Sequence, residues 1–329
     1  MFSGVKPTGH LTLGNYLGAV RRWVEEDQHR GEALFCVVDL HALTMDHDPA
    51  RVRRLSRQAA SLLLASGLDP AVCTVFVQSH VDEHARLSYL LECVASDGEM
   101  RRMIQYKEKT AQAVASGQSV RLSLLTYPAL MAADILAYDA VEVPVGEDQT
   151  QHVELTRDLA ERFNHRYGLT FVVPRAINPP VAARVMDLQN PGSKMGKSHD
   201  ATAGIVYLLD EPDVIVRKVK RAVTDSGAGV TYDRAGRPGL ANLLEILAAC
   251  TGKKPAALAD AYAGAGALKA DTADAVIELL RPLRARHAEL SADPAQLDAI
   301  LREGAARARS IARPVVDRAY RAIGLLPPA

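Results

Sequence analysis

The sequence predicts an α/β fold in which a doubly wound, parallel, Rossmann-like nucleotide-binding sheet is followed by a smaller all-helical domain. Short β-rich runs alternate with helical patterns in the first half, and the runs are almost entirely apolar, as in strands covered on both faces. After about residue 201 such runs become rare, and Ala, Leu and Arg recur with helical spacing. We therefore expect one domain over residues 1–200 and a helical domain over 201–329, whose last helix can pack back on the first domain.

Each element has its own pattern. The strands expected from β-rich apolar runs are 2–5, 34–38 and 74–78. The helices expected from their periodicity are 16–26, 51–66, 83–96, 240–250, 270–287 and 297–313. Residues 224–238 are rich in Gly, Asp and Pro, so we expect an ordered surface loop there.

Composition argues against several classes of protein. Lys plus Arg equals Asp plus Glu at 39 each, so net charge gives no evidence for a nucleic-acid partner. The four cysteines lie far apart in apolar segments without a CxxC pair, which fits a reducing cytoplasm and argues against a zinc site. The sequence has no signal-peptide pattern and no apolar run of about 18 residues, so we expect neither export nor a membrane span.

The first segment with chemical content follows the first expected strand. Residues 6–15 (KPTGHLTLGN) form a glycine-bearing turn that leads into a helix, an arrangement that can hold a phosphate at the helix N-terminus. Gly14 would let an adenine or ribose approach the backbone, which a Cβ would prevent. Glycine turns after strands are common, so a nucleotide site and an ordinary turn are equally compatible with this segment alone.

The second segment is a loop over residues 193–200 (SKMGKSHD), with Lys194 and Lys197 three positions apart. Two flexible ammonium groups suit a pyrophosphate leaving group, whose charge grows in the transition state. Taken alone, a solvated basic loop is the simpler interpretation.

The third segment places Asp134 among apolar residues of an expected helix, followed by residues 143–149 (VPVGEDQ). A buried carboxylate without a partner is unfavourable, so Asp134 must be paired or contact a ligand. An indole N–H is one such partner, and capping or pairing within the fold is an equal alternative.

Together, the three segments resemble class I aminoacyl-tRNA synthetases, and specifically the bacterial tryptophanyl branch, over essentially the whole chain. Residues 7–15 are similar to the first signature, with Thr12 and Asn15 where other class I enzymes have histidines. Residues 194–198 (KMGKS) are similar to the second signature, KMSKS, and residues 124–136 and 143–164 match the amino-acid pocket and its link to the nucleotide site. His10 lies outside both histidine positions, so we interpret it as a turn residue.

The resemblance implies a role for each matching position. Asp134 would accept the indole N–H, Tyr127 and Gln149 would bind the α-amino group, and the apolar pocket would be shaped by Met131, Val143 and Val145. The implied ATP contacts are Lys6, Pro7, Thr8, Gly14, Asn15, Gly146, Glu147, Asp148, Val185, Lys194, Met195, Gly196, Lys197 and Ser198. The implied catalytic set is Thr12, Asn15, Lys109, Lys194, Lys197 and Ser198, with Lys109 as a further phosphate-binding lysine and no metal held by protein ligands.

The implied activity is that of a cytoplasmic, homodimeric ligase that activates L-tryptophan with ATP and Mg²⁺ and transfers it to tRNA(Trp). Residues 1–200 would carry both signatures, and residues 201–329 would bind the tRNA and its anticodon. Some arginines of the helical part are expected to contact phosphates, although such arginines are commonly just solvated. They are Arg281, Arg284, Arg286, Arg302, Arg307, Arg309, Arg313, Arg318 and Arg321.

Two positions depart from the family pattern. Lys6 replaces a glutamine, from which we infer an accessory isozyme with altered sensitivity to tryptophan-like inhibitors; an inhibition constant equal to that of Lys6→Gln would contradict this. Gly196 replaces the central serine of KMSKS, which removes a hydroxyl but retains both lysines. A tyrosyl-tRNA synthetase and a non-catalytic paralogue that binds tryptophan or a protein are the rival interpretations.

Overall fold

The computed structural model describes residues 1–146, 149–177, 184–196 and 202–326. Three parallel strands pair in the order β1-β2-β3, and two further parallel strands, β4 and β5, pair with each other. The strands are β1 Phe2–Val5, β2 Leu34–Val37, β3 Thr74–Val77, β4 Glu142–Pro144 and β5 Arg175–Ile177. Because β1 also contacts β4, the spatial order is β3-β2-β1 followed by β4-β5, and the direction of winding reverses at β1.

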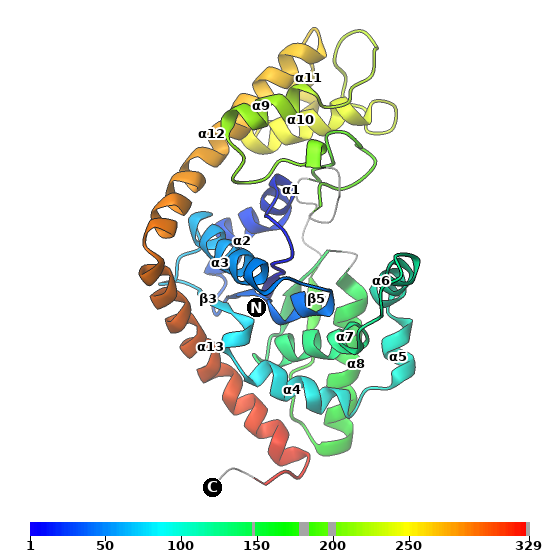
Figure 1. Ribbon diagram of the computed structural model, residues 1–329, viewed down its shortest axis with the longest axis vertical. Helices are drawn as coiled ribbons and strands as arrows, with labels where there is room; N and C mark the ends of the chain where they lie inside the picture. Colours follow the sequence, from blue (N-terminus) through cyan, green and yellow to red (C-terminus); the bar gives the residue numbers. More distant parts are fainter. Residues whose placement is uncertain (147–148, 178–183, 197–201, 327–329) are drawn as a thin grey trace.

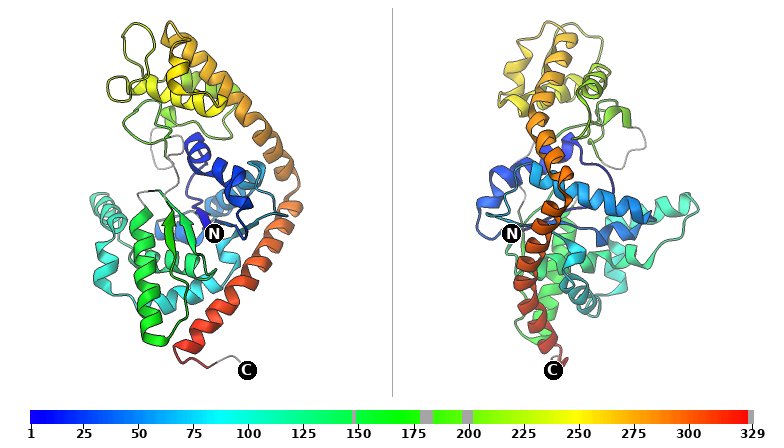
Figure 2. Two further views of the ribbon diagram at one scale, coloured as in Figure 1. Left: turned by 180° about the vertical axis from the view of Figure 1, so that it is seen from behind. Right: turned by 60° about the vertical axis from the view of Figure 1, so that its left-hand side comes forward.

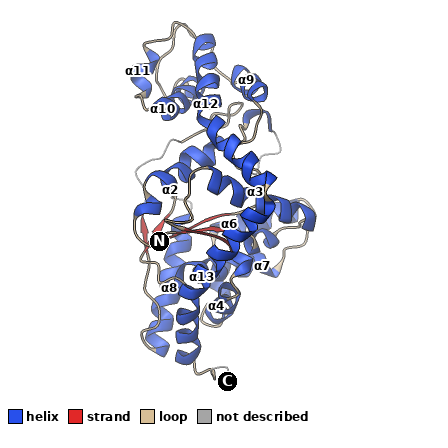
Figure 3. Cartoon of the chain, turned by 90° about the vertical axis from the view of Figure 1, so that its left-hand side faces the viewer, coloured by secondary structure: helices blue, strands red, loops and turns tan. Residues whose placement is uncertain are grey.

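The central strands are buried because helices surround the sheet (Figure 3). Successive side chains of a strand point to opposite faces, so Leu34 and Cys36 enter one core cluster while Phe35 and Val37 enter the other. Both faces therefore need apolar residues, which explains why the strands are apolar without alternation. The predicted α/β class is confirmed.

Helices that precede residue 178 connect and cover the strands. They are α1 Leu13–Asn15, α2 Arg21–Glu25, α3 Pro49–Ala65, α4 Glu83–Glu92, α5 Asp97–Arg102, α6 Ile104–Ala115, α7 Leu122–Leu136 and α8 Thr150–Tyr167, with the π-helical η1 Tyr16–Val20 between α1 and α2. The short 3₁₀ turns are η2 Asp27–His29, η3 Leu40–Thr44 and η4 Gln78–His80. The helix expected over 83–96 ends early because Ser96 and Glu99 form a capping box that starts α5.

The last part of the described chain is helical. Its elements are η6 Thr202–Gly204, α9 Pro212–Lys220, α10 Pro238–Thr251, α11 Pro255–Ala259, α12 Ala265–Ala292 and α13 Pro294–Ala322. The predicted domain boundary at residue 200 lies outside the described residues. Figures 1 and 2 show α12 and α13 as one long bent column along a flank of the molecule. The bend falls at Asp293, whose side chain accepts from the Gln296 N–H and starts α13.

Helix α13 runs back over the α/β part and packs against β3. Near its end, Arg318 donates to both carboxylate oxygens of Asp139 and to the Thr170 carbonyl. None of the described helices is long and apolar enough to cross a membrane. All four cysteines are free thiols.

Gly304 permits the closest approach between α13 and the sheet. A Cβ built there would lie 2.0 Å from the Val75 carbonyl oxygen in β3. A side chain at this position would push α13 away from β3 and would loosen the packing between them.

We expect Gly304→Ala to lower the free energy of unfolding by about 1–3 kcal/mol, although alanine favours helices, because the clash outweighs helix propensity. Urea denaturation followed by circular dichroism measures this. Gly266→Ala in α12, where an added Cβ meets nothing within 4 Å, is the matched control and should not destabilise. Equal stability of both variants would contradict the packing argument.

Candidate functional site

The candidate site lies where the winding of the sheet reverses. The carboxyl end of β1 leads into Lys6, Pro7 and Thr8, and that of β4 leads into Val145 and Gly146. Helices leave neighbouring strands in opposite directions at such a point, so a crevice opens outside the strand ends, where ligands bind in open α/β sheets.

Thr12 and Asn15 cap the helix that follows the turn. The Thr12 Oγ1 accepts from the Asn15 N–H at 3.2 Å, and the Asn15 Oδ1 accepts from the Thr12 N–H at 3.1 Å. Thr12 is fully buried and also donates to the Met195 carbonyl at 3.3 Å. Both residues therefore support the turn and join it to the second signature, and their catalytic role stays a prediction.

Gly14 lies directly under the second signature. A Cβ at Gly14 would stand 2.8 Å from the Met195 carbonyl oxygen and 3.2 Å from the Met195 Cβ. The group that approaches the Gly14 backbone in this structure is thus Met195, whereas the sequence suggested an adenine or ribose. The glycine is required for the two signature segments to touch.

The segment before the second signature is held by the helical part. Met195 donates its N–H to Val185, and Met186 pairs with Lys194 in an antiparallel bridge. The side-chain amide of Asn242 in α10 both accepts from the Met186 N–H and donates to its carbonyl. Asn242 thus connects α10 to the bridge of Met186 and Lys194, and the Lys194 side chain is exposed.

Two lysines face each other beside the turn. The Lys6 ammonium donates to the Thr44 hydroxyl at 3.3 Å. Burial, and then repulsion from Lys109, lowers the pKa of Lys6 from its ordinary value to about 8. Lys109 in α6 bonds to Gln112 on the same helix. The positive charges of Lys6 and Lys109 repel each other. An anion bound between them would relieve this repulsion.

Asp134 is buried at the centre of a polar cluster. Its Oδ1 accepts from the Gln78 amide at 2.7 Å and from His84 Nδ1 at 2.6 Å, and its Oδ2 accepts from His41 Nε2 at 2.8 Å. Burial works to raise the pKa of Asp134, but the interactions with His84 and His41 outweigh it and hold the pKa at about 2. The carboxylate is therefore ionised and already hydrogen-bonded within the fold.

The other pocket residues surround this cluster. Tyr127 bonds through its hydroxyl to His152 Nε2 at 2.7 Å, and its ring packs edge-on against His41. Val143 and Val145 are buried, and Met131 and Gln149 are partly buried. These residues come from α7, from the end of β4 and from the start of α8, three elements that meet beside the sheet edge. The expected contacts Glu147, Asp148, Lys197 and Ser198 lie outside the described residues.

Sequence reasoning missed the partners of Asp134. His41 follows β2, Gln78 follows β3, and His84 lies in α4, at separations of 93, 56 and 50 residues from Asp134. The one available signal was that polar residues follow two apolar strands whose carboxyl ends share a sheet edge.

Most of the arginines expected to include RNA contacts are also bonded within the protein, and an RNA contact by some of them stays a prediction. Three of them pair with carboxylates of their own helix, namely Arg281, Arg286 and Arg313. Four reach other elements and so fasten α12 or α13, namely Arg284, Arg307, Arg309 and Arg318.

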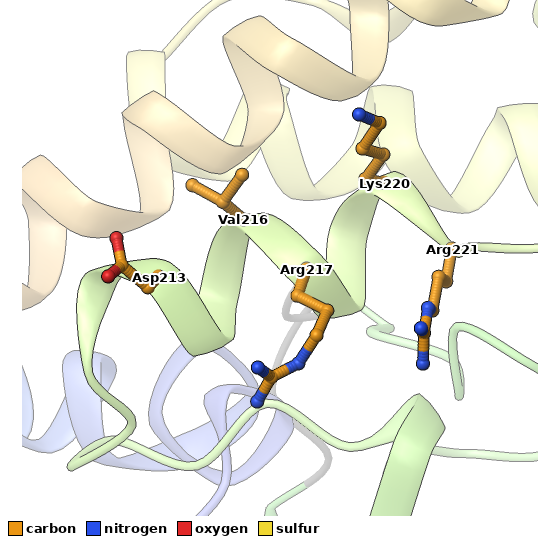
Figure 4. A pocket seen from close by; sticks show the side chains of 5 residues that line it. All are labelled: Asp213, Val216, Arg217, Lys220 and Arg221. Atoms are coloured by element: carbon orange, nitrogen blue, oxygen red, sulfur yellow. The ribbon is translucent and has the colours of Figure 1, made fainter.

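Helix α9 instead carries side-chain cations without a protein partner among the described residues. Asp213, Val216, Arg217, Lys220 and Arg221 line an open hollow of about 620 Å³. Arg217 and Arg221 point to the same side of the helix (Figure 4). The hollow is shallow and basic, as expected for a surface that meets a polyanion.

Comparison with known proteins places these features in a family. Residues 1–281 match the family model described as class I tRNA synthetases (W and Y). The chain is 77% identical over 328 residues to tryptophan–tRNA ligase 1 of Streptomyces coelicolor, covering all of this chain and 98% of the relative.

Solved structures agree. Tryptophanyl-tRNA synthetase of Mycoplasma pneumoniae matches with a TM-score of 0.89 at 33% identity, covering 99% of this chain and 97% of that chain. The tryptophanyl-tRNA synthetase of Campylobacter jejuni, complexed with ADP and tryptophan, matches with a TM-score of 0.85 at 32% identity, covering 98% of this chain and 99% of that chain.

The lowered pKa of Lys6 predicts a pH-dependent stability. Between about pH 8 and the ordinary value of 10.5, the unfolded chain holds a proton on Lys6 that the folded chain has lost. Unfolding then takes up a proton, so this residue makes the free energy of unfolding rise with pH. We expect wild type to gain stability relative to Lys6→Gln as pH rises from 8 to 10. Urea denaturation at a series of pH values measures this difference. Wild type and Lys6→Gln curves of unfolding free energy against pH that run parallel would contradict the prediction. Lys253→Gln, at an exposed lysine, is the control.

Proposed function

This chain belongs to the class I tRNA synthetases of the tryptophan and tyrosine branch, and from that premise we propose how its own residues activate and transfer the amino acid. Relatives named tryptophan–tRNA ligase match the whole chain at 75–77% identity, so it is a tryptophan-specific aminoacyl-tRNA synthetase. This excludes both the tyrosyl interpretation and the non-catalytic paralogue. The cluster around Asp134 is the structural observation that supports the proposed mechanism best, because it presents an ionised acceptor beside an apolar pocket.

In the first step, the tryptophan carboxylate attacks the α-phosphorus of ATP, and pyrophosphate leaves with the electrons of the broken P–O bond. In the second, a ribose hydroxyl of the tRNA terminus attacks the carbonyl of the adenylate, and AMP leaves. Neither step needs a protein nucleophile, so positioning and charge stabilisation account for the catalysis. We assign charge stabilisation to Lys6, Lys109, Lys194 and Lys197.

ATP would bind in the crevice between the β1 turn and the second signature. The residues there suit its phosphates, because Lys6 and Lys109 already repel each other and Lys194 is exposed on the neighbouring segment. No group of three or more His, Cys, Asp or Glu side chains in the described ranges could hold a metal. We propose that Mg²⁺ would be held by the ATP phosphates and would help neutralise the leaving pyrophosphate.

Tryptophan would lie across α7. Its indole N–H would bind Asp134, and its α-amino group would bind Tyr127 and Gln149. A competitor without the N–H leaves an acceptor of the buried carboxylate unpaired, which costs about 1–3 kcal/mol.

We place the tRNA on the helical part through α9. Arg217, Lys220 and Arg221 are available for phosphates, whereas most arginines of α12 and α13 are engaged. Because Asn242 connects α10 to the segment of Met195, contact with tRNA at this end would be felt at the second signature.

The enzyme is proposed to act as a homodimer in the cytoplasm. Ile104, Val114 and Leu122 are large apolar residues exposed by 57%, 67% and 74% on α6 and the start of α7. A second copy of the chain would cover them. Sedimentation equilibrium should give twice the mass of one chain, and a monomer would refute this.

ATP–pyrophosphate exchange with tryptophan, tyrosine or no amino acid tests the reaction and the pocket. We expect exchange with tryptophan alone, and we expect Asp134→Asn to lower it about 10- to 100-fold. The exposed Asp274→Asn on α12 is the control. Exchange driven by tyrosine, or an unchanged Asp134→Asn, would contradict the proposal.

Replacing Arg217, Lys220 and Arg221 together by alanine should raise the KM for tRNA and flatten its salt dependence by about 1–3 in log–log slope, because up to three phosphate contacts are lost. ATP–pyrophosphate exchange should be unchanged, since it needs no tRNA. The exposed Arg53→Ala, on α3, is the control. If the triple variant charged tRNA with an unaltered salt slope, α9 would not be the contact surface.

A further inference from the structure

The two oxygens of the Asp134 carboxylate have different surroundings. Oδ1 accepts two hydrogen bonds, from Gln78 and His84, which are both fully buried. Oδ2 accepts from His41, whose ring lies against Tyr127 on the side of the proposed amino-acid site. A carboxylate oxygen accepts about two hydrogen bonds, so Oδ1 is full and Oδ2 has one acceptor position left. Only Oδ2 can receive an indole N–H without losing a protein donor.

The two residues that donate to Oδ1, Gln78 and His84, each form a further hydrogen bond that orients them. The Gln78 carbonyl accepts from the Leu40 N–H at 3.0 Å, which orients its amide group toward Asp134. His84 Nε2 lies 2.8 Å from the Tyr138 hydroxyl. A carboxylate only accepts, so His84 Nδ1 carries a proton, and in the neutral ring its Nε2 then accepts from the Tyr138 O–H.

Aromatic rings fix this chain of hydrogen bonds in place. The Tyr138 ring stacks on Phe2 of β1 at 5.6 Å, and the His84 ring stacks on Phe76 of β3 at 6.0 Å. The rings are buried between the sheet and α7, so neither can turn without disturbing the core. The orientation of the carboxylate is therefore set by groups that no substrate touches.

We propose that Tyr138 and His84 are positioning residues for tryptophan selection, which hold Asp134 so that Oδ2 faces the indole N–H. The relay runs from the Tyr138 O–H to His84 Nε2, and from the His84 Nδ1–H to Asp134 Oδ1. This inference rests on the proposed function, because it assigns the specificity of the amino-acid site to residues behind it. It explains why a histidine and a tyrosine are buried together here with matched donors and acceptors.

The test compares tryptophan with β-(benzothiophen-3-yl)alanine, in which sulfur replaces the indole N–H at nearly the same size. In Tyr138→Phe, the kcat/KM of amino-acid-dependent ATP–pyrophosphate exchange should fall about 10-fold for tryptophan, mainly through KM, and less than about 2-fold for the analogue. Tyr262→Phe is the matched control, since it also removes one hydrogen bond of a tyrosine hydroxyl, here to the Asp271 carboxylate at the surface of the helical part.

A second pair of variants distinguishes a loss of positioning from a general loss of folding. His84→Asn keeps an N–H donor near Nδ1 and should retain more discrimination than His84→Leu, which removes the donor. Equal losses for tryptophan and the analogue in Tyr138→Phe, or equal discrimination in both His84 variants, would overturn the inference and leave a purely structural cluster. Failure of wild type to exchange with tryptophan would instead overturn the proposed function.

Discussion

Burial of the parallel sheet on both faces is the constraint from which the site follows. Once helices cover β2 and β3, the strand faces cannot bind a ligand, and only the carboxyl ends remain open. The polar residues with chemical roles therefore lie just after strands, with Lys6 after β1, His41 after β2 and Gln78 after β3. The core and the site are consequences of the same arrangement.

Asp134 shows how such a fold tolerates a buried charge. An ionised carboxylate in an apolar interior is costly unless donors replace its lost water. Two histidines and a glutamine provide them. In the proposed function, the same three donors would serve both the stability of the fold and the selection of the substrate. The equal alternatives left by the sequence, internal pairing and ligand contact, are compatible in this geometry.

The two signature segments contact each other directly, through the Thr12 hydroxyl, the Gly14 backbone and Met195. Asn242 then joins this contact to α10, which gives a mechanical connection between the helical part and the nucleotide side. At the far flank, three bonded arginines and Gly304 hold α13 against the α/β part. The cations Arg217, Lys220 and Arg221 of α9 form no such bonds among the described residues, which is why the proposal places the tRNA there.

The sequence by itself determined the α/β class, the first three strands, the helical part and the need for Asp134 to be paired, because these depend on local periodicity and on the cost of a buried charge. The capping box of Thr12 and Asn15 is also local, although its reach to Met195 across 183 residues is not. Only the tertiary structure decided which groups surround Asp134, what lies over Gly14 and which arginines are bonded. These contacts join residues far apart in the chain, and their partners depend on how strands and helices pack, which no local pattern records.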